Sequence, residues 1–296
     1  MRLLFLIGLC TVSWTGTASA QRVFDDWPVR TGAGPDALLR GVEAVYWNPS
    51  AITTHTYRGG VFVADQRTPD GVGVGGFAAA GAWRLDARTT IAAGYQHFGI
   101  DDIGETSESP LPDEGISPTF SIAEDQLHFG AAHALSEGLS AGAGFRYDRS
   151  NESGIHEATT SLVTGFVFTP ALATLARFQP SLGATLLARG GGIRWSGGVD
   201  FALPALADLT ARLGYGARGG DGMPGLEHRI GLTGTWRQLL TASVGAMSAS
   251  AGEGRSWETT FGAGLRVNRY ELGVLRESLS NDFGAAYSFR LRFGID

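Results

Sequence analysis

Hydrophobic and polar positions alternate along most of this chain. Near its end, for example, apolar Phe289 and Leu291 are separated by Arg290. Successive side chains of a β-strand point to opposite faces, so such segments are predicted to be strands with one apolar and one polar face. The pattern recurs in segments at approximately 57–64, 72–83, 88–98, 123–134, 138–149, 157–168, 180–189, 192–202, 208–218, 227–236, 239–249, 256–267, 270–277 and 283–294.

Charged residues fall mostly on the polar face of these segments. A charge on the lipid face of a membrane barrel costs about 2–4 kcal/mol near the midplane, so the separation favours a barrel whose apolar face meets lipid. A soluble β-sandwich is the alternative, but it does not explain aromatic residues at strand ends such as Tyr147, Trp195 and Trp236. The charges predicted to face the lumen are Arg146, Asp148, Arg194, Asp200, Arg212, Arg266, Arg290 and Arg292.

The connections between the predicted strands alternate in length. Arg237–Gln238 is a short one, whereas Gly99 to Ile122 is long and polar. Outer-membrane barrels have short periplasmic turns and longer extracellular loops. The sequence therefore predicts an all-β, transmembrane antiparallel β-barrel of about 14 strands, with both termini in the periplasm.

The N-terminus resembles a secretory signal peptide. Arg2 precedes a short apolar run that ends in the small residues Ala18-Ser19-Ala20. We expect residues 1–20 to be the signal peptide, 21–56 an N-terminal plug segment and 57–296 the outer-membrane β-barrel. The single cysteine, Cys10, lies within the signal peptide, so the mature chain is expected to have no disulfide or thiolate site.

Composition narrows the function further. The chain has 44 Gly, only 18% charged residues and a formal net charge of -6, which argues against nucleic acid as a partner. Gly138-Leu-Ser140-Ala-Gly142 matches a nucleophile-elbow pattern, but it lies in an alternating strand rather than at a strand-turn-helix corner. The histidines show no metal-ligand spacing. No catalytic, cofactor or metal site is predicted, and an enzyme is not expected.

Residues 21–56 do not alternate. Leu38, Val42 and Val45 recur with helical spacing, and Asn48-Pro49 is expected to end this helical segment. A barrel of this size leaves a water-filled lumen unless something fills it. We therefore predict that the segment plugs the lumen through Leu38, Leu39, Val42, Tyr46, Trp47, Asn48 and Pro49.

One part of the plug segment carries a family resemblance. The sequence Tyr46-Trp-Asn-Pro-Ser-Ala-Ile52 lies immediately before the first predicted strand. It resembles the N-terminal motif of the long-chain fatty-acid transporter (FadL-type) superfamily, especially its PorV/PorQ-like branch. Ser50 and Ala51 depart mildly from the small residues usual there, and the plug is short. The resemblance implies a 14-stranded barrel whose N-terminal segment plugs the lumen.

The expected function is passive passage of hydrophobic small molecules across the outer membrane, as the resemblance also implies. One alternative is a PorV-like partner of a protein secretion system, of the type IX kind, which uses the barrel as a docking site. A general porin is a further alternative. The expected partners are outer-membrane lipid and lipopolysaccharide, together with either a hydrophobic substrate or secretion-system proteins, and no cofactor is expected.

Overall fold

A computed structural model describes residues 34–54, 57–68, 74–104, 119–152, 155–171, 177–223, 225–251, 254–278 and 285–296. The predicted signal peptide and residues 21–33 of the predicted plug lie outside this part of the chain. No helix among the described residues is both long and apolar enough to cross a membrane.

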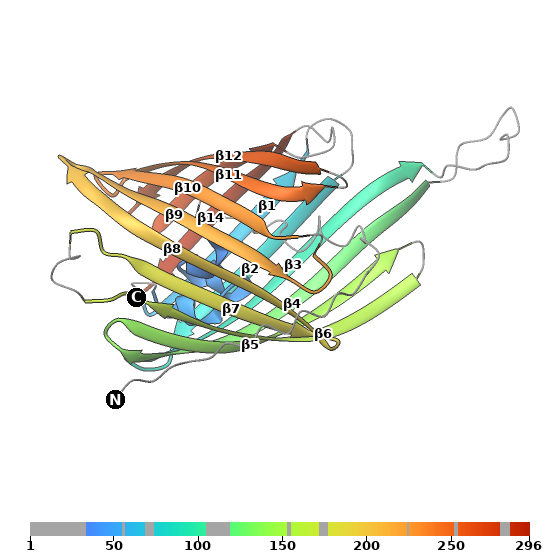
Figure 1. The fold of residues 1–296 in the computed structure, drawn as a ribbon, viewed down its shortest axis with the longest axis horizontal. Helices are drawn as coiled ribbons and strands as arrows, with labels where there is room; N and C mark the ends of the chain where they lie inside the picture. Colours follow the sequence, from blue (N-terminus) through green and yellow to red (C-terminus); the bar gives the residue numbers. More distant parts are fainter. Residues whose placement is uncertain are drawn as a thin grey trace, which may run out of the picture.

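The described residues form a closed barrel of 14 antiparallel strands, in which each strand pairs with its neighbours in sequence (Figure 1). β1 pairs with β14 and closes the barrel, from Gly59↔Ile295 to Arg67↔Tyr287. The strands are β1 (Gly59–Arg67), β2 (Val74–Arg84), β3 (Thr89–Gly104), β4 (Thr119–Ser136), β5 (Leu139–Glu152), β6 (Ile155–Phe168), β7 (Ser181–Arg189), β8 (Gly192–Leu206), β9 (Leu209–Gly220), β10 (Glu227–Trp236), β11 (Leu240–Ala251), β12 (Gly254–Val267), β13 (Tyr270–Ser278) and β14 (Ala285–Ile295).

The predicted fold class is confirmed, and most strand boundaries agree within a few residues. The predicted long loop from Gly99 to Ile122 is wrong at both ends, because β3 continues to Gly104 and β4 begins at Thr119. The pairing register shifts between Ile100 and Ile103. Such an irregularity breaks the alternation of faces, so the sequence pattern hid the continuation of both strands.

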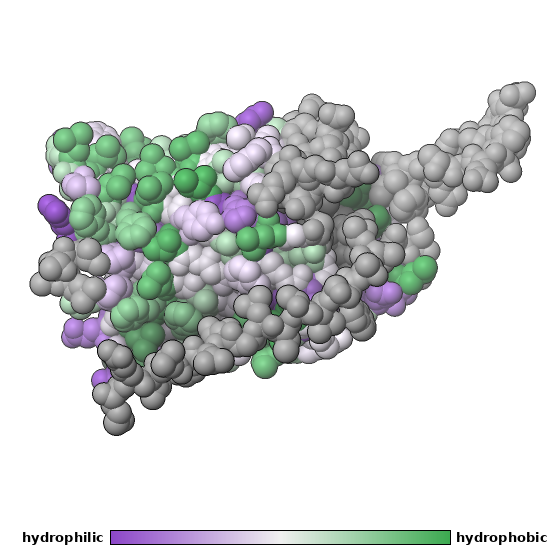
Figure 2. All heavy atoms as spheres, in the orientation of Figure 1, coloured by the Kyte–Doolittle hydropathy of each residue, from purple (hydrophilic) through white to green (hydrophobic). Residues whose placement is uncertain are grey.

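The outer face of the barrel is apolar. Large hydrophobic side chains such as Phe129, Leu186 and Phe261 point outward and are at least half exposed. Figure 2 shows hydrophobic side chains spread over the visible outer surface. A surface of this kind is stable when lipid rather than water covers it, as expected for an outer-membrane barrel. A few charged residues do point outward, among them Arg67 and Arg276.

The plug lies inside the barrel (Figure 1). It consists of three 3-10 helices, η2 (Asp36–Leu38), η3 (Val42–Tyr46) and η4 (Pro49–Thr54), rather than the single helical segment that its apolar spacing suggested. Gly41, with a φ of 102°, separates the first two, because this backbone conformation cannot continue a right-handed helix. The main buried hydrophobic cluster joins the plug to the barrel wall, with Leu38, Val42, Tyr46 and Ile52 packed among Phe62, Ala64 and Ala80.

Candidate functional site

Asn48 is the hydrogen-bonding centre of the plug. Its Nδ2 donates to the carbonyl oxygens of Ala37 (2.6 Å) and Phe166 on β6 (3.3 Å). Its Oδ1 accepts from the backbone N–H (3.1 Å) and the hydroxyl (2.6 Å) of Ser50. The fully buried side chain therefore uses both of its donors and accepts two bonds, which ties η2, η4 and the wall together.

Tyr46 fixes the plug to another part of the wall, at β2 and β3. Its hydroxyl lies 2.7 Å from the carbonyl oxygen of Ala79 on β2 and 3.0 Å from that of Tyr95 on β3, and can donate to either. The ring meets His128 edge-on, with centroids 4.8 Å apart. Burial, reinforced by the nearby Glu43, raises the pKa of the Tyr46 hydroxyl well above its usual range. Tyr46 is therefore a neutral donor at any physiological pH.

Glycines line the wall where the plug touches it. A Cβ atom on Gly142 would lie 2.4 Å from the Ser50 nitrogen, and one on Gly183 would lie 2.4 Å from the Ala37 oxygen. A Cβ atom on Gly165 would lie 2.3 Å from Asn48 Oδ1. Such distances are impossible for a real side chain, so these wall positions need glycine for the backbone of the plug to approach.

Two acidic plug residues form ion pairs with arginines of the wall. Asp36 pairs with Arg229 on β10, and its other oxygen lies 3.9 Å from Arg218 on β9. Glu43, which is fully buried, pairs with Arg292 on β14. These contacts fix the plug on two sides of the lumen, in addition to the contacts of Tyr46 and Asn48.

Glu271 on β13 extends the Glu43 contact into a small network. It pairs with Arg292 and, at 2.6 Å, with Arg266 on β12. Arg292 therefore lies between a plug carboxylate and a wall carboxylate. A cavity of about 270 Å³, here called the lower cavity, lies on the side of the plug that faces the short turns. Its lining includes Glu43, Arg266 and Arg292.

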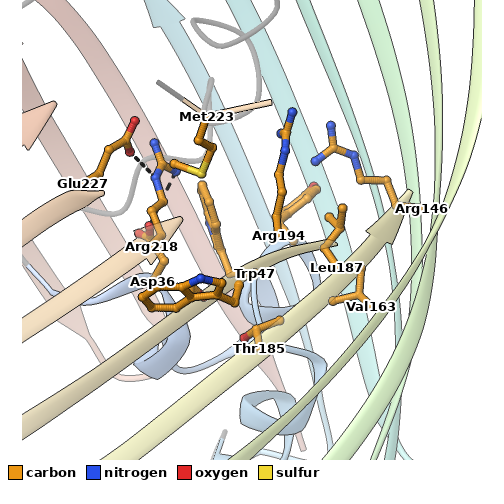
Figure 3. Close-up of a pocket in the computed structure, with 13 residues that line it drawn as sticks. Asp36, Trp47, Arg146, Val163, Thr185, Leu187, Arg194, Arg218, Met223 and Glu227 are labelled. Carbon is orange, nitrogen blue, oxygen red and sulfur yellow. Dashed lines mark hydrogen bonds and ion pairs between the residues drawn. The ribbon is translucent and has the colours of Figure 1, made fainter. Parts of the chain in front are cut away.

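A cavity of about 100 Å³, here called the upper cavity, lies on the side of the plug that faces the long loops, between the plug and strands β5 to β10. In Figure 3, Trp47 lies along one side of it, Arg146 and Arg194 point into the same region, and Arg218 pairs with Glu227 across from them. Val163, Leu187 and Met223 supply apolar wall. The cavity thus combines an aromatic and aliphatic lining with charges.

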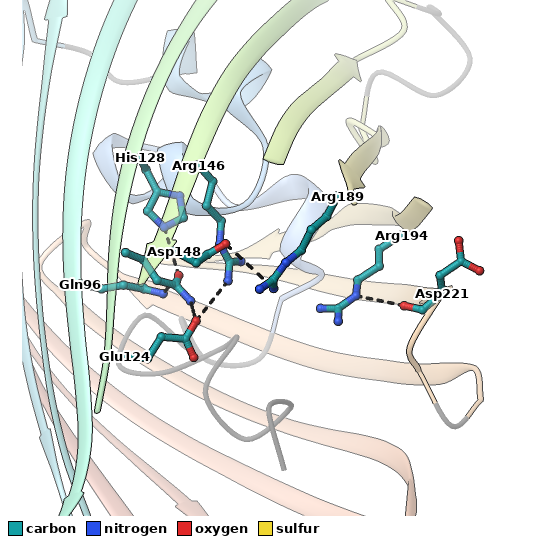
Figure 4. A network of polar contacts seen from close by, with 9 residues as sticks. Gln96, Glu124, His128, Arg146, Asp148, Arg189, Arg194 and Asp221 are labelled. Carbon is teal, nitrogen blue, oxygen red and sulfur yellow. Dashed lines mark hydrogen bonds and ion pairs between the residues drawn. The ribbon is translucent and has the colours of Figure 1, made fainter. Parts of the chain in front are cut away.

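A polar network continues from this cavity; it is buried on β3, β4 and β5 and exposed at Arg194 on β8 (Figure 4). Gln126 Oε1 accepts from Gln96 and lies 3.2 Å from His128 Nε2, while Gln126 Nε2 donates to Glu124 at 2.7 Å. The remaining contacts are Arg146 with Asp148 and with Glu124 (3.8 Å), Arg189 with Asp148 (4.0 Å), and Arg194 Nε donating to the Asp221 carbonyl oxygen (3.2 Å). Each of these arginines therefore has an oxygen partner.

The structure places the predicted plug residues as follows. Leu38, Val42, Tyr46, Asn48 and Pro49 are buried in the lumen, while Leu39 and Trp47 are partly buried. The eight predicted charges also lie on the lumenal side, but they are spread over it. Arg146 and Arg194 line the upper cavity, Arg266 and Arg292 line the lower one, Arg212 pairs with Asp200 (2.6 Å), Asp148 pairs with Arg146, and Arg290 lies beside Arg292.

Sequence reasoning missed the ion-pairing residues Asp36, Glu43, Arg218 and Arg229. Asp36 and Glu43 are the two acidic residues between positions 34 and 54 of the plug, where they lie among mostly apolar neighbours, and that contrast was a usable signal. Their partners could not be found from local patterns, since Arg229 is 193 positions away from Asp36. Ser140, in the rejected elbow motif, donates its hydroxyl to the Ser50 carbonyl oxygen at 3.0 Å and so also holds the plug.

Comparison with known proteins identifies the fold. No protein-family model and no curated protein matches the sequence. The toluene transporter TbuX of Ralstonia pickettii superimposes with a TM-score of 0.61 at 11% identity, over 90% of this chain and 96% of that one. The toluene transporter TodX of Pseudomonas putida gives 0.59 at 10% identity, over 89% and 95% of the two chains.

A FadL homologue of Pseudomonas aeruginosa gives a TM-score of 0.58 at 10% identity, over 92% of this chain and 98% of that one. At such identities the likeness concerns the fold alone. It confirms the FadL-type resemblance at that level, whereas the PorV/PorQ-like branch stays a prediction. The chain thus has the fold of the FadL-type outer-membrane channels.

Proposed function

We propose that the protein is a plugged outer-membrane channel through which small hydrophobic molecules pass by diffusion. The observation that carries this proposal is the cavity of about 100 Å³ above the plug, with Trp47, Val163, Leu187 and Met223 in its lining. An apolar cavity of roughly 150 Å³ in another protein binds benzene. The volume of this cavity is of the same order, which matches a ligand with a single aromatic ring. Toluene transporters are among the structures of the same fold.

The state of the lumenal charges also supports this function. Arg146 faces Asp148 and Glu124, Arg218 faces Glu227, and Arg292 faces Glu43 and Glu271. Paired charges of both signs leave little net field for an ion to follow. Together with the plug, this pairing favours slow passage of neutral molecules over bulk conduction of ions.

Removal of the plug tests the proposal. In planar bilayers the full-length protein should be nearly silent, and deletion of residues 22–45 should convert it into a conducting pore. Trp47→Ala should give a weaker, flickering conductance, because it removes a large contact but leaves the segment tethered. In intact cells, whose outer leaflet of glycolipid slows hydrophobic solutes, the full-length protein should speed the uptake of toluene but not of a sugar of similar size. Uptake of toluene no faster than in cells that lack the protein would refute the proposal.

The alternative functions predict other results. A general porin would show large, steady conductance with the plug present and would admit the sugar. A PorV-like partner of a secretion system would pass neither solute and would copurify with other secretion proteins. The filled lumen argues against the first alternative, and no contact of the described residues specifically favours the second.

A further inference from the structure

A row of cationic and aromatic side chains crosses three neighbouring strands on the outer face of the barrel. Tyr287 on β14 is directly opposite Arg276 on β13 and Arg67 on β1. All three share the outward face with lipid-facing residues such as Leu272 and Phe289. Because neighbouring strands lie about 4.8 Å apart, the two arginines stand about 10 Å from each other across the tyrosine.

The row differs from most of the outer surface. Arg149 on β5 also points outward, but it lies directly opposite Asp125 on β4. From β7 to β12, the outward positions whose side chains the structure describes carry no Arg, Lys, Asp or Glu. Arg67 is highly exposed, at 76% of its side-chain area, and Asp65, at 3.0 Å, is its only partner among the residues that the structure describes. Within the described residues, the exposed Arg276 guanidinium and the Tyr287 hydroxyl make no hydrogen bond or ion pair. The row therefore offers donors to a partner outside the barrel.

The height of the row places it near a lipid headgroup. Tyr270 marks the other edge of β13, beside its short turn, and Arg276 lies six residues further along. Six residues span about 20 Å of strand, which a tilt of about 40° reduces to about 15 Å of height. The apolar band of such barrels is about 25 Å tall, and long arginine side chains extend toward the interface. The backbone of Arg276 then lies about 10 Å from the far edge of this band, and the long side chain covers most of that distance. The guanidinium groups therefore lie close to the headgroup region of the leaflet at the long-loop end.

An arginine on the lipid face is unfavourable without an anionic partner. In the part of the chain that the structure describes, Asp65 partners Arg67, but Arg276 has no such partner, so an anionic group is expected to cover this row. Guanidinium groups bind phosphate through paired N–H donors, and the tyrosine hydroxyl adds another. On the side of the row toward the short turns, an apolar surface on which acyl chains can lie is formed by Val274, Phe289 and Leu291. We propose that Arg276, Tyr287 and Arg67 bind a phosphate group of the outer-leaflet glycolipid, lipopolysaccharide, whose chains cover this surface.

Lipid binding to the full-length, detergent-purified barrel tests this proposal. Lipopolysaccharide is added to delipidated protein in a phosphate-free maltoside detergent, and its affinity is measured by native mass spectrometry. Arg276→Gln should weaken binding about tenfold, which corresponds to about 1.4 kcal/mol. The double variant Arg67→Gln/Arg276→Gln should weaken it about a hundredfold. Tyr287→Phe should cause a smaller loss, since it removes only the hydroxyl.

Arg237→Gln is the matched control. Arg237 lies at the opposite edge of the barrel, over the Trp236 ring and paired with Asp208 at 2.8 Å, so its replacement should change affinity less than twofold. Unchanged affinity in the double variant would overturn the proposal. Equal affinity for dephosphorylated lipopolysaccharide would overturn the phosphate contact, and equal affinity for phosphatidylglycerol would overturn the assignment to the glycolipid. Heat-dependent gel migration establishes that each variant is a folded barrel.

Discussion

The contact between Glu43 and Arg292 gives the sharpest test of how the plug is held. Glu43 is fully buried, and Arg292 on β14 is its ion-pair partner. Glu43→Gln keeps the shape of the side chain but removes its charge. Arg292 keeps a second carboxylate partner in Glu271, so the substitution does not leave an uncompensated buried cation in the wall. The substitution should therefore mainly weaken the docking of the plug, rather than destabilise the barrel wall.

The expected size of the effect follows from this arrangement. Hydrogen bonds to charged groups contribute about 1.5–3 kcal/mol, and loss of one partner from a fully isolated buried pair costs about 3–5 kcal/mol. Because Glu271 remains, we expect the lower range, about 2 kcal/mol. A free-energy change of about 1.4 kcal/mol alters an equilibrium constant tenfold, so the population of the undocked plug should rise about thirtyfold.

Single-channel recording in planar bilayers measures this change as the fraction of time that the channel is open. Asp208→Asn is the control, because it makes a similar chemical change in a surface pair with Arg237, far from the plug. The charge exchange Glu43→Arg with Arg292→Glu should recover part of the wild-type silence. If the deletion of residues 22–45 conducts but Glu43→Gln stays as silent as the wild type, the ion pair does not hold the plug.

Three further substitutions or insertions test other parts of the structure. Gly165→Ala should shift the plug and raise conductance, because its Cβ atom would lie 2.3 Å from Asn48 Oδ1, whereas Gly81→Ala, with no atom nearer than 3.9 Å, should behave as wild type in the same recording. Leu291→Arg places a charge on the lipid face and should cost about 2–4 kcal/mol, seen as reduced barrel assembly in vivo, while the volume-conserving Leu291→Met should assemble normally. An epitope inserted at Pro112, outside the described residues, should be reachable by antibody on intact cells, and one inserted between Asn268 and Arg269 only after the outer membrane is opened; the reverse result would invert the topology.

The strands could be predicted from the sequence because their signal is local. The alternation of apolar and polar residues can be recognised from adjacent positions alone, as in the segment from Phe289 to Phe293. This pattern located all 14 strands. The prediction was wrong where the backbone was irregular. At the shift between Ile100 and Ile103 the alternation breaks, so the pattern ended β3 too early and began β4 too late.

The plug illustrates the limit of local reasoning. Its apolar residues and the Asn48-Pro49 stop were visible in the sequence, but its hydrogen-bonding geometry was not. Asn48 binds Phe166, and Glu43 binds Arg292, and neither contact leaves a trace in residue spacing. The high glycine content was also visible early, whereas the positions at which glycine is required, such as Gly142 and Gly165, depend on where the plug lies.

The pairing of Glu43 with Arg292 has a consequence for the order of assembly. Arg292 belongs to β14, which is the last strand of the chain and closes the barrel against β1. The plug precedes β1, so its docking site on β14 does not exist until the two ends of the chain have met. Contacts between distant parts of a chain form late, because loop closure must come first. Plug docking is therefore expected to be the final folding event, and a nascent barrel should pass through a transient open state before it becomes sealed.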